Sequence, residues 1–430
     1  MLLLYVEKVF TILALLFYTG AIAPFFPESD PRYFLVNIFP IPAFAFTLIL
    51  ISVRWQRVLS IAIRGVFLWI FVAIAVASPL WSDWTTETFE KVLPLVRVTV
   101  FAIYFSTCYS LRQQLQLLTW AFGIAAVLSF IICVAVPSRG VMGVGFISSM
   151  EDIVHTGKWR GIFIHKTELA SWMVLTTIFS SFSAISTWRY RRLFWALSCL
   201  AVGLILKANS KGALVILFIL LLLAYLYRFL RLRFNVSVPI LIFFLFIVGG
   251  VAVVLISNTE LIVISLGRDI TFSGRTEFWP FLLDKVWERP WLGYGYEAFW
   301  EGGWKGEPAD IWKYLKDGFR PPHAHNGVLE MLLSFGIAGF ASFAVGYIIA
   351  SVKAIAWVRF LPTIEGLLPL TYLTFMMLIN LTESYLMKPD TYWILYISFT
   401  LSMFNKSINL AEAERITQFQ SQLKISPGAA

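Results

Sequence analysis

The chain has 430 residues, of which 59% are hydrophobic, 17% aromatic and only 14% charged. One water-soluble core cannot bury that much apolar surface, so the composition excludes an ordinary soluble domain and predicts an all-α polytopic membrane protein. The net charge of +9 is explained by basic loops on one side of the membrane, and we do not interpret it as nucleic-acid binding.

Apolar runs predict the membrane-spanning helices. A helix needs roughly 17–25 mainly apolar residues to cross about 30 Å of hydrocarbon. The sequence offers about twelve such runs, of which 193–208 and 390–405 are the weakest: 9–26, 33–53, 60–80, 92–110, 115–136, 167–187, 193–208, 212–230, 237–256, 327–350, 367–386 and 390–405.

Charge placement predicts the orientation. Loops carrying Arg54, Arg112, Arg189, Arg228 and Lys353 alternate with loops such as "PESDPR" and "WSDWTTETFE". Short cytoplasmic loops accumulate Lys and Arg, so both termini are expected in the cytoplasm. Four segments are then expected in order. Residues 1–256 hold helices 1–9, with a smaller non-cytoplasmic loop at 137–166, and residues 257–326 form a large non-cytoplasmic loop with amphipathic helices. Residues 327–405 hold the last three helices, and residues 406–430 are a cytoplasmic tail.

Cations on the non-cytoplasmic side are the first candidate binding residues. The smaller loop contains Arg160, His165 and Lys166 in "WRGIFIHKTELA". Lys207 and Lys211, in "KANSKGALV", lie in a very short loop on that side, against the positive-inside trend. A function is the first hypothesis for a cation so placed, and snorkelling of the side chain to the interface is the alternative.

The large loop is rich in aromatic residues. Ser273 is expected to cap a helix over 274–288, closed by Pro290, whose apolar residues recur every three or four positions, as in a helix lying on the membrane surface. The aromatic side chains fit an interfacial belt, and a minority of them could instead stack on sugar rings in a glycan groove: Trp279, Trp287, Trp291, Tyr294, Tyr296, Trp300, Trp304, Trp312 and Tyr314.

Arg275, in "GRDITFSGRTEFW", is expected at the start of that helix. There its guanidinium and the exposed backbone N–H groups together suit an anion. Arg268 is a weaker second candidate for the same role. Contact with a lipid headgroup is the alternative for both arginines.

The four histidines all lie outside the apolar runs, and two of them, His323 and His325, precede the run 327–350. Asn326 is a good helix cap, so His325 is expected beside the positive end of the helix dipole, where a neutral imidazole is favoured and can act as a general base. The alternative is a histidine that only hydrogen-bonds the loop. His323 is expected to be positional. The two histidines with Glu330 do not complete a convincing metal set, so neither a metal nor another cofactor is predicted.

One base, several cations on the outer side and aromatic surfaces match one reaction: transfer of a glycan from a lipid diphosphate to a sugar hydroxyl. A diphosphate leaves readily once cations neutralise it, so no general acid is needed, whereas the acceptor hydroxyl does need a base.

The chain resembles the O-antigen ligase and Wzy polymerase superfamily, and within it the ExoQ-like exopolysaccharide production proteins. The likeness runs over about residues 75–390, through "SPLWSDW", "WRGIFIHKTELA", "NSKGAL", "GRDITFSGRTEFW", "RPWLGYGYEAFW", "HAHNGVLEMLLSFGIAGF" and "NLTES". It implies a metal-independent glycosyltransferase of the GT-C type in the bacterial inner membrane, with a large periplasmic loop. The implied partners are an undecaprenyl-diphosphate-linked oligosaccharide donor, a glycan acceptor and the lipid bilayer, with chain-length regulator and export proteins as further candidates.

The resemblance also implies roles for particular residues. It makes His325, in the "HN" pair, the base and Arg275, in "GRT", a diphosphate ligand. Lys211 stands in "NSKG" where the family usually has arginine, which keeps the charge but loses the bidentate fork. His165 and Lys166, in "HKT" where the family has "HKN", are carried over as binding candidates only.

Three functions remain open from the sequence. The leading hypothesis is an inverting polymerase of lipid-linked repeat units, and the runner-up is a ligase that moves finished glycan onto a lipid A core. A lipid-linked oligosaccharide flippase is a third, from another class, with Arg64 and Arg97 as its best intramembrane charges. The functional groups of transporters tend to lie near the membrane midplane, whereas the candidates here lie in loops.

Overall fold

The fold is described from a computed structural model, which places residues 2–21, 38–145, 150–231, 275–313, 315, 320–361, 363–405 and 411. These residues are mainly helical, and among them the only strand-like pairing is one isolated bridge between Val141 and Trp159. The predicted all-α class is confirmed for this part of the chain. The predicted span 237–256, Ser273, Arg268 and the tail 406–430 lie outside the described residues.

The helices follow one another with short connections in most places. The first half of the chain contains α1 (Leu2–Tyr18), α3 (Pro40–Ser52), α4 (Trp55–Arg64), α5 (Val66–Ala77), η2 (Ser78–Leu80), α6 (Thr85–Cys108), α7 (Leu111–Ala135), α8 (Pro137–Gly140), α9 (Met150–Val154) and α10 (Lys166–Ser186). The second half contains α11 (Arg191–Ala208), α12 (Lys211–Arg231), α15 (Arg275–Glu288), η3 (Gly303–Lys305), α16 (Pro308–Trp312), α17 (Gly327–Phe360), η5 (Glu365–Leu367), α18 (Leu368–Ile379) and α19 (Thr391–Ser402).

Every predicted span other than 237–256 overlaps an observed helix. Four helices in the described part are long and apolar enough to cross a membrane, or five if the bent pair α3 and α4 counts as one span, so a multi-pass membrane protein is supported and the number twelve stays a prediction. The predicted helix over 60–80 is interrupted, because α4 ends at Arg64 and α5 begins at Val66. Gly65 lies between them, and a Cβ there would lie 2.5 Å from Leu401 Cδ2, so the break holds a residue without a side chain.

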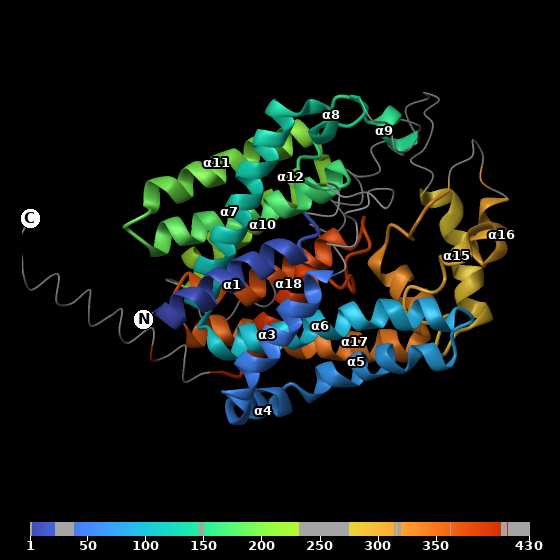
Figure 1. The fold of residues 1–430 in the computed structure, drawn as a ribbon, viewed down its shortest axis with the longest axis horizontal. Helices are drawn as coiled ribbons and strands as arrows, with labels where there is room; N and C mark the ends of the chain where they lie inside the picture. The colour runs from blue at the N-terminus through green and yellow to red at the C-terminus, as the bar shows by residue number, and fades with distance from the viewer. Residues whose placement is uncertain are drawn as a thin grey trace, which may run out of the picture.

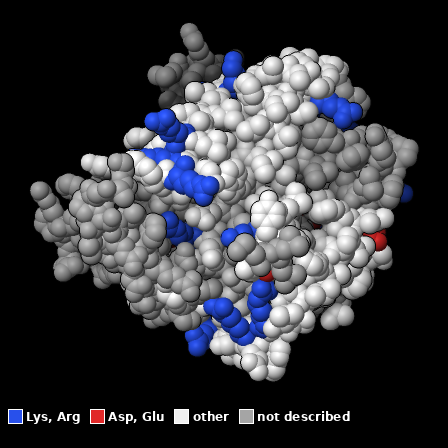
Figure 2. Space-filling model, turned by 60° about the vertical axis from the view of Figure 1, so that its left-hand side comes forward, with Lys and Arg blue, Asp and Glu red and all other residues white. Residues whose placement is uncertain are grey.

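The two long polar loops lie at the same end of the helical body. In Figure 1, α8 and α9 and, separately, α15 and α16 project near the right-hand end, whereas α1 begins at the other end. Figure 2 turns that opposite end toward the viewer, and Lys and Arg side chains gather there with few acidic ones between them. This separation of loops from basic side chains is the pattern on which a membrane orientation can be argued.

A break in α17 joins the large loop to the membrane helices. Gly336 has φ 60° and ψ −162°, a conformation open essentially only to glycine. The break lets Ile337 N donate to Pro290 O (2.7 Å), while Leu333 O and Ser334 O accept from the backbone N–H groups of residues 294 and 295 (2.8 and 3.0 Å). Segment 290–295 is therefore fixed directly onto α17.

α15 packs on the protein through the face that the sequence predicts to be apolar. Phe278, Leu282 and Val286 are buried in one cluster with Leu329 and Leu333 of α17. The helix 274–288 is thus confirmed as α15, but its apolar face contacts other parts of the chain and is not left to cover a membrane surface.

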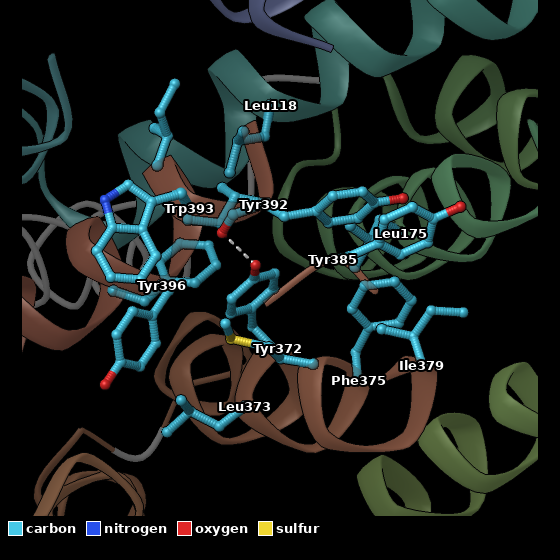
Figure 3. Packing of buried hydrophobic residues seen from close by; sticks show 14 of the residues in the cluster. Leu118, Leu175, Tyr372, Leu373, Phe375, Ile379, Tyr385, Tyr392, Trp393 and Tyr396 are labelled. Carbon is cyan, nitrogen blue, oxygen red and sulfur yellow. Dashed lines mark hydrogen bonds between the residues drawn. The ribbon is translucent and has the colours of Figure 1, made fainter. Parts of the chain in front are cut away.

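The segment that follows α18 is held by a stack of aromatic rings. Tyr392 lies against Trp172 of α10 with centroids 3.9 Å apart, and against Tyr385 at 4.8 Å. Figure 3 shows these tyrosines with Tyr372, whose hydroxyl donates to the backbone oxygen of Tyr392. Residues 381–390 are consequently anchored on both sides, which matters because they supply a carboxylate to the site.

Candidate functional site

The N-terminus of α17 is capped as the sequence predicts. Asn326 Oδ1 accepts from Val328 N (3.0 Å) and Leu329 N (3.1 Å). His325, just before the cap, has φ 49°, a left-handed conformation that costs an ordinary L-residue about 1–2 kcal/mol. The chain accepts that conformation here, and it turns the His325 side chain out of the helical path.

The loop that carries the histidines is fixed to the segment after α18. Gly327 N donates to Asn380 O (2.8 Å) and Asn326 N donates to Ser384 Oγ (3.2 Å). A Cβ on Gly327 would lie 2.5 Å from Asn380 Oδ1, so only glycine permits this approach. The motifs "HAHNG" and "NLTES", far apart in sequence, thereby form one unit.

This unit brings a carboxylate to the histidines. His325 Nδ1 lies 3.8 Å from Glu383 Oε2, and both side chains are largely buried. That separation is within ion-pair range and somewhat longer than a hydrogen bond, as is common for catalytic pairs without substrate. His323 lies beside them, with its ring centroid 4.0 Å from that of His325 and its Nδ1 accepting from His325 N (3.2 Å). Glu383 is a residue that the sequence reasoning missed.

The carboxylate considered from the sequence for a metal set has another position. Glu330 Oε2 accepts from Ala324 N (2.7 Å), between the two histidines, and Glu330 Oε1 accepts from Trp300 Nε1 (2.8 Å). Ligand atoms of His323, His325 and Glu383 all lie within 4.8 Å of one another and could hold a metal ion. The carboxylate that completes a possible set with His323 and His325 is thus Glu383, whereas both oxygens of Glu330 already accept hydrogen bonds from the large loop.

The aromatic residues of the large loop divide into two groups. Trp279 Nε1 donates to Ala324 O (2.9 Å) and Tyr296 OH donates to Met387 O (2.7 Å), so these side chains brace the histidine loop and the 381–390 segment. In contrast, Trp287, Trp291 and Trp304 are more than half exposed. Only the exposed group fits the predicted interfacial belt.

A cavity of about 240 Å³ opens beside His323. Its walls come from α6, the large loop, the start of α17 and the 381–390 segment. Charged side chains line it alongside Trp300 and Ser384: Lys91, Glu297, Glu330 and Lys388. A polar pocket thus lies next to the group of His323, His325 and Glu383, at the loop end of the molecule.

The smaller loop forms a second group of polar side chains. Arg160 pairs with Asp152 at 3.1 Å and donates from Nε to Arg139 O (2.8 Å), so its charge is used within the loop. His165 caps α10 by accepting from Thr167 N (3.3 Å). The predicted binding role of Arg160 and His165 stays a prediction, and both have structural contacts that the sequence did not indicate.

Lys166, the residue after His165, is largely buried and lies among other cationic side chains of the smaller loop. Burial, with the charges of Lys166, Lys158 and His165, lowers the pKa of His155 to about 3. His155 is therefore neutral at physiological pH, mainly because it is buried, and the neighbouring Lys166 and Lys158 add a positive potential that would favour an anion.

The fold does not show the remaining predicted cations beside His323, His325 and Glu383. Lys211 is the exposed first residue of α12, and no hydrogen bond or ion pair between described residues joins it to His325. Arg275 is the first residue of α15, where the predicted anion site would lie, and its side chain and Arg268 are outside the described part. Their roles stay predictions.

Comparison with known proteins finds a similarity over part of the chain. Residues 195–344 match a family model described as O-Antigen ligase. The Exopolysaccharide production protein ExoQ of Rhizobium meliloti (strain 1021) is 31% identical over 93 residues, which cover 21% of this chain and 21% of ExoQ. The chain thus spans about a fifth of the curated relative's length in this match. Over residues 195–344 the chain is therefore similar to the O-antigen ligase family, in agreement with the resemblance seen in its motifs.

Proposed function

We propose that this protein polymerises undecaprenyl-diphosphate-linked oligosaccharide repeat units in exopolysaccharide or O-antigen synthesis, by inverting and metal-independent glycosyl transfer. The observation that carries the proposal is the pair of His325 and Glu383 beside a polar cavity at the loop end of the molecule. The family match and the likeness to ExoQ support this class of reaction. The gathering of Lys and Arg at the opposite end supports an inner-membrane orientation with both termini in the cytoplasm and the site in the periplasm.

In the proposed mechanism, a hydroxyl of the acceptor sugar attacks the anomeric carbon of the donor. The bond from this carbon to the diphosphate oxygen breaks as the new glycosidic bond forms, so undecaprenyl diphosphate leaves with the bonding electrons. His325 takes the hydroxyl proton. Because Nδ1 faces Glu383, Nε2 is the nitrogen assigned to this proton, and Glu383 stabilises the imidazolium that results.

The diphosphate is assigned to cations of the two loops. Arg275 at the first turn of α15 is the leading candidate, because a guanidinium and helix N–H groups together suit an anion. Lys211, Lys166 and Arg268 are further candidates. We expect Arg275→Ala to weaken binding of the lipid-linked donor more than Arg275→Lys, since lysine keeps the charge but not the fork. Donor binding to the purified variants in detergent measures this difference, and equal, negligible effects would remove Arg275 from the site.

The histidine cluster also permits a test of metal independence. A divalent cation held by His323, His325 and Glu383 would occupy the nitrogen or carboxylate that the base mechanism uses. We expect protein washed with EDTA to keep its full transfer activity on extracted lipid-linked repeat units. A loss that Zn²⁺, Mn²⁺ or Mg²⁺ restores would replace the base mechanism by a metal-assisted one.

A ligase that transfers finished glycan to lipid A core is the second candidate, favoured by the description of the family that matches residues 195–344. Deletion of the gene in its source bacterium separates the functions when lipid-linked glycans are sized by mass spectrometry. Accumulation of single repeat units without polymer supports the polymerase. Long glycan left on its carrier shows a ligase, and units retained on the cytoplasmic face show a flippase.

A further inference from the structure

The cavity beside the histidines has the size and lining of a site for one sugar ring. Its volume of about 240 Å³ is below the roughly 300–1,000 Å³ of pockets that take drug-sized ligands, so it suits one ring better than an oligosaccharide. Trp300 offers an aromatic surface, and Glu297, Ser384 and Lys388 offer polar groups. Polar groups converging around an aromatic side chain are what a hydroxyl-rich ring requires.

Among the residues that line the cavity, Glu297 has a backbone conformation that packing and secondary structure alone do not explain. Its φ of 51° is left-handed, a conformation in which glycine is favoured. The same turn uses glycine at the positive φ angles of Gly293 and Gly295. A glutamate kept where glycine would be less strained indicates that its side chain is needed, since such strain concentrates at functional sites.

The carboxylate of Glu297 is available to a ligand. Among the described residues, no hydrogen-bond donor is assigned to it, although its backbone oxygen accepts from Lys91 Nζ (3.1 Å). Burial raises the pKa of Glu297 above its ordinary value, against the attraction of Lys91 and Lys388. A partly buried carboxylate without donors gains most from a ligand that supplies them.

The surrounding charges favour a neutral ligand. Lys91 forms an ion pair with Glu301, so its charge is already balanced, and Lys388 lies over the ring of Tyr385 at 4.9 Å from the centroid. With Glu297 and Glu330 also in the lining, the cavity has no excess of positive charge. An anionic sugar would therefore gain little there, whereas the hydroxyl groups of a neutral sugar can donate to the carboxylate.

We infer that this cavity binds the acceptor sugar of the transfer reaction, a neutral hydroxyl-rich ring whose hydroxyl groups donate to Glu297 and whose face contacts Trp300. The inference rests on the proposed function. A sugar in this cavity is the acceptor only if His325, which lies next to His323 at the cavity wall, is the base. Glu297 then determines which sugar is accepted, and it takes no part in proton transfer.

Binding of the acceptor can be measured apart from transfer. The probe is the repeat-unit oligosaccharide released by mild acid from the lipid carrier of a gene-deletion strain, and the readout is a thermal shift of the purified protein titrated with it. We expect Glu297→Gln to weaken binding roughly 10- to 100-fold, the effect of losing a charged hydrogen-bond acceptor. Glu90→Gln is the matched control, because Glu90 is exposed, next to Lys91 and outside the cavity lining. Equal affinity in wild type and Glu297→Gln would overturn the inference.

A second variant separates a binding role from a structural one. Glu297→Gly relieves the left-handed strain, so we expect unfolding at the same or a higher temperature than wild type, with acceptor binding lost to the same degree as in Glu297→Gln. A Glu297→Gly protein that unfolds earlier and still binds the oligosaccharide would show that the side chain only supports the loop. Because these measurements need no transfer, they can fail while the polymerase assignment stands, and a failure of the His325 base would leave them unaffected.

Discussion

Replacement of His325 is expected to abolish glycosyl transfer. Loss of a general base costs on the order of 10²–10⁴ in rate, and the neighbouring His323 is poorly placed to replace it, since its Nδ1 already accepts from the backbone N–H of His325. Transfer by the purified variant, followed as polymer formed from extracted lipid-linked repeat units, measures the effect.

The choice of substitution decides whether that experiment is interpretable. Alanine disfavours the φ of 49° found at His325, so His325→Ala could act through the backbone. Asparagine tolerates the left-handed conformation and is no base, which makes His325→Asn the better test. We expect it to unfold close to the wild-type temperature and to be inactive. Polymer of wild-type length and yield from His325→Asn would exclude the base role.

The helices could be predicted from the sequence because their signals are local. Apolar runs indicated the described helices of the membrane part other than α4, and Asn326 indicated where α17 begins. The bends could not be predicted. At the breaks, Leu401 approaches Gly65 and Trp291 approaches Gly336 too closely for a side chain, and such contacts between distant segments leave no pattern in the local sequence.

The candidate site could be predicted only in part, for the same reason. His325 was recognisable because the helix cap follows it directly. Glu383 was not, because its approach to His325 depends on hydrogen bonds between the "HAHNG" and "NLTES" segments and on the aromatic stack around Tyr392. A signal was nevertheless present: Glu383 is an acidic residue inside the predicted apolar run 367–386, where charged residues are few.

Arg160 shows what the sequence leaves open about the candidate cations. Charge and position made Arg160 a binding candidate, yet it is paired with Asp152 and with the Arg139 carbonyl oxygen. In the sequence, an arginine that forms an ion pair within its loop cannot be distinguished from an arginine that binds a phosphate. The partner's position in space separates the two roles, and only the fold supplies it.

Replacement of Glu383 is expected to have the second largest effect on transfer. Glu383→Gln keeps the size of the side chain and removes the charge that stabilises the His325 imidazolium during proton transfer. We expect the rate at neutral pH to fall on the order of 100-fold, less than the loss of a tightly hydrogen-bonded triad carboxylate, because Nδ1 and Oε2 are 3.8 Å apart. Glu383→Asp should retain part of the activity, since it keeps the charge.

A comparison of size and charge separates this role from a structural one. Glu383→Asp keeps the charge and shortens the side chain, whereas Glu383→Gln keeps the size and removes the charge. A role in proton transfer predicts that Glu383→Gln loses more of kcat than Glu383→Asp, with KM for the donor little changed and both variants unfolding close to the wild-type temperature. Glu365→Gln is the matched control, because Glu365 is also buried and lies 3.9 Å from Arg112, away from the histidines. It can lower the unfolding temperature but should leave kcat of the folded protein in place. A Glu383→Gln variant that loses transfer only in proportion to its loss of folded protein would mean that Glu383 only holds the loop, and the base would then act without a carboxylate partner.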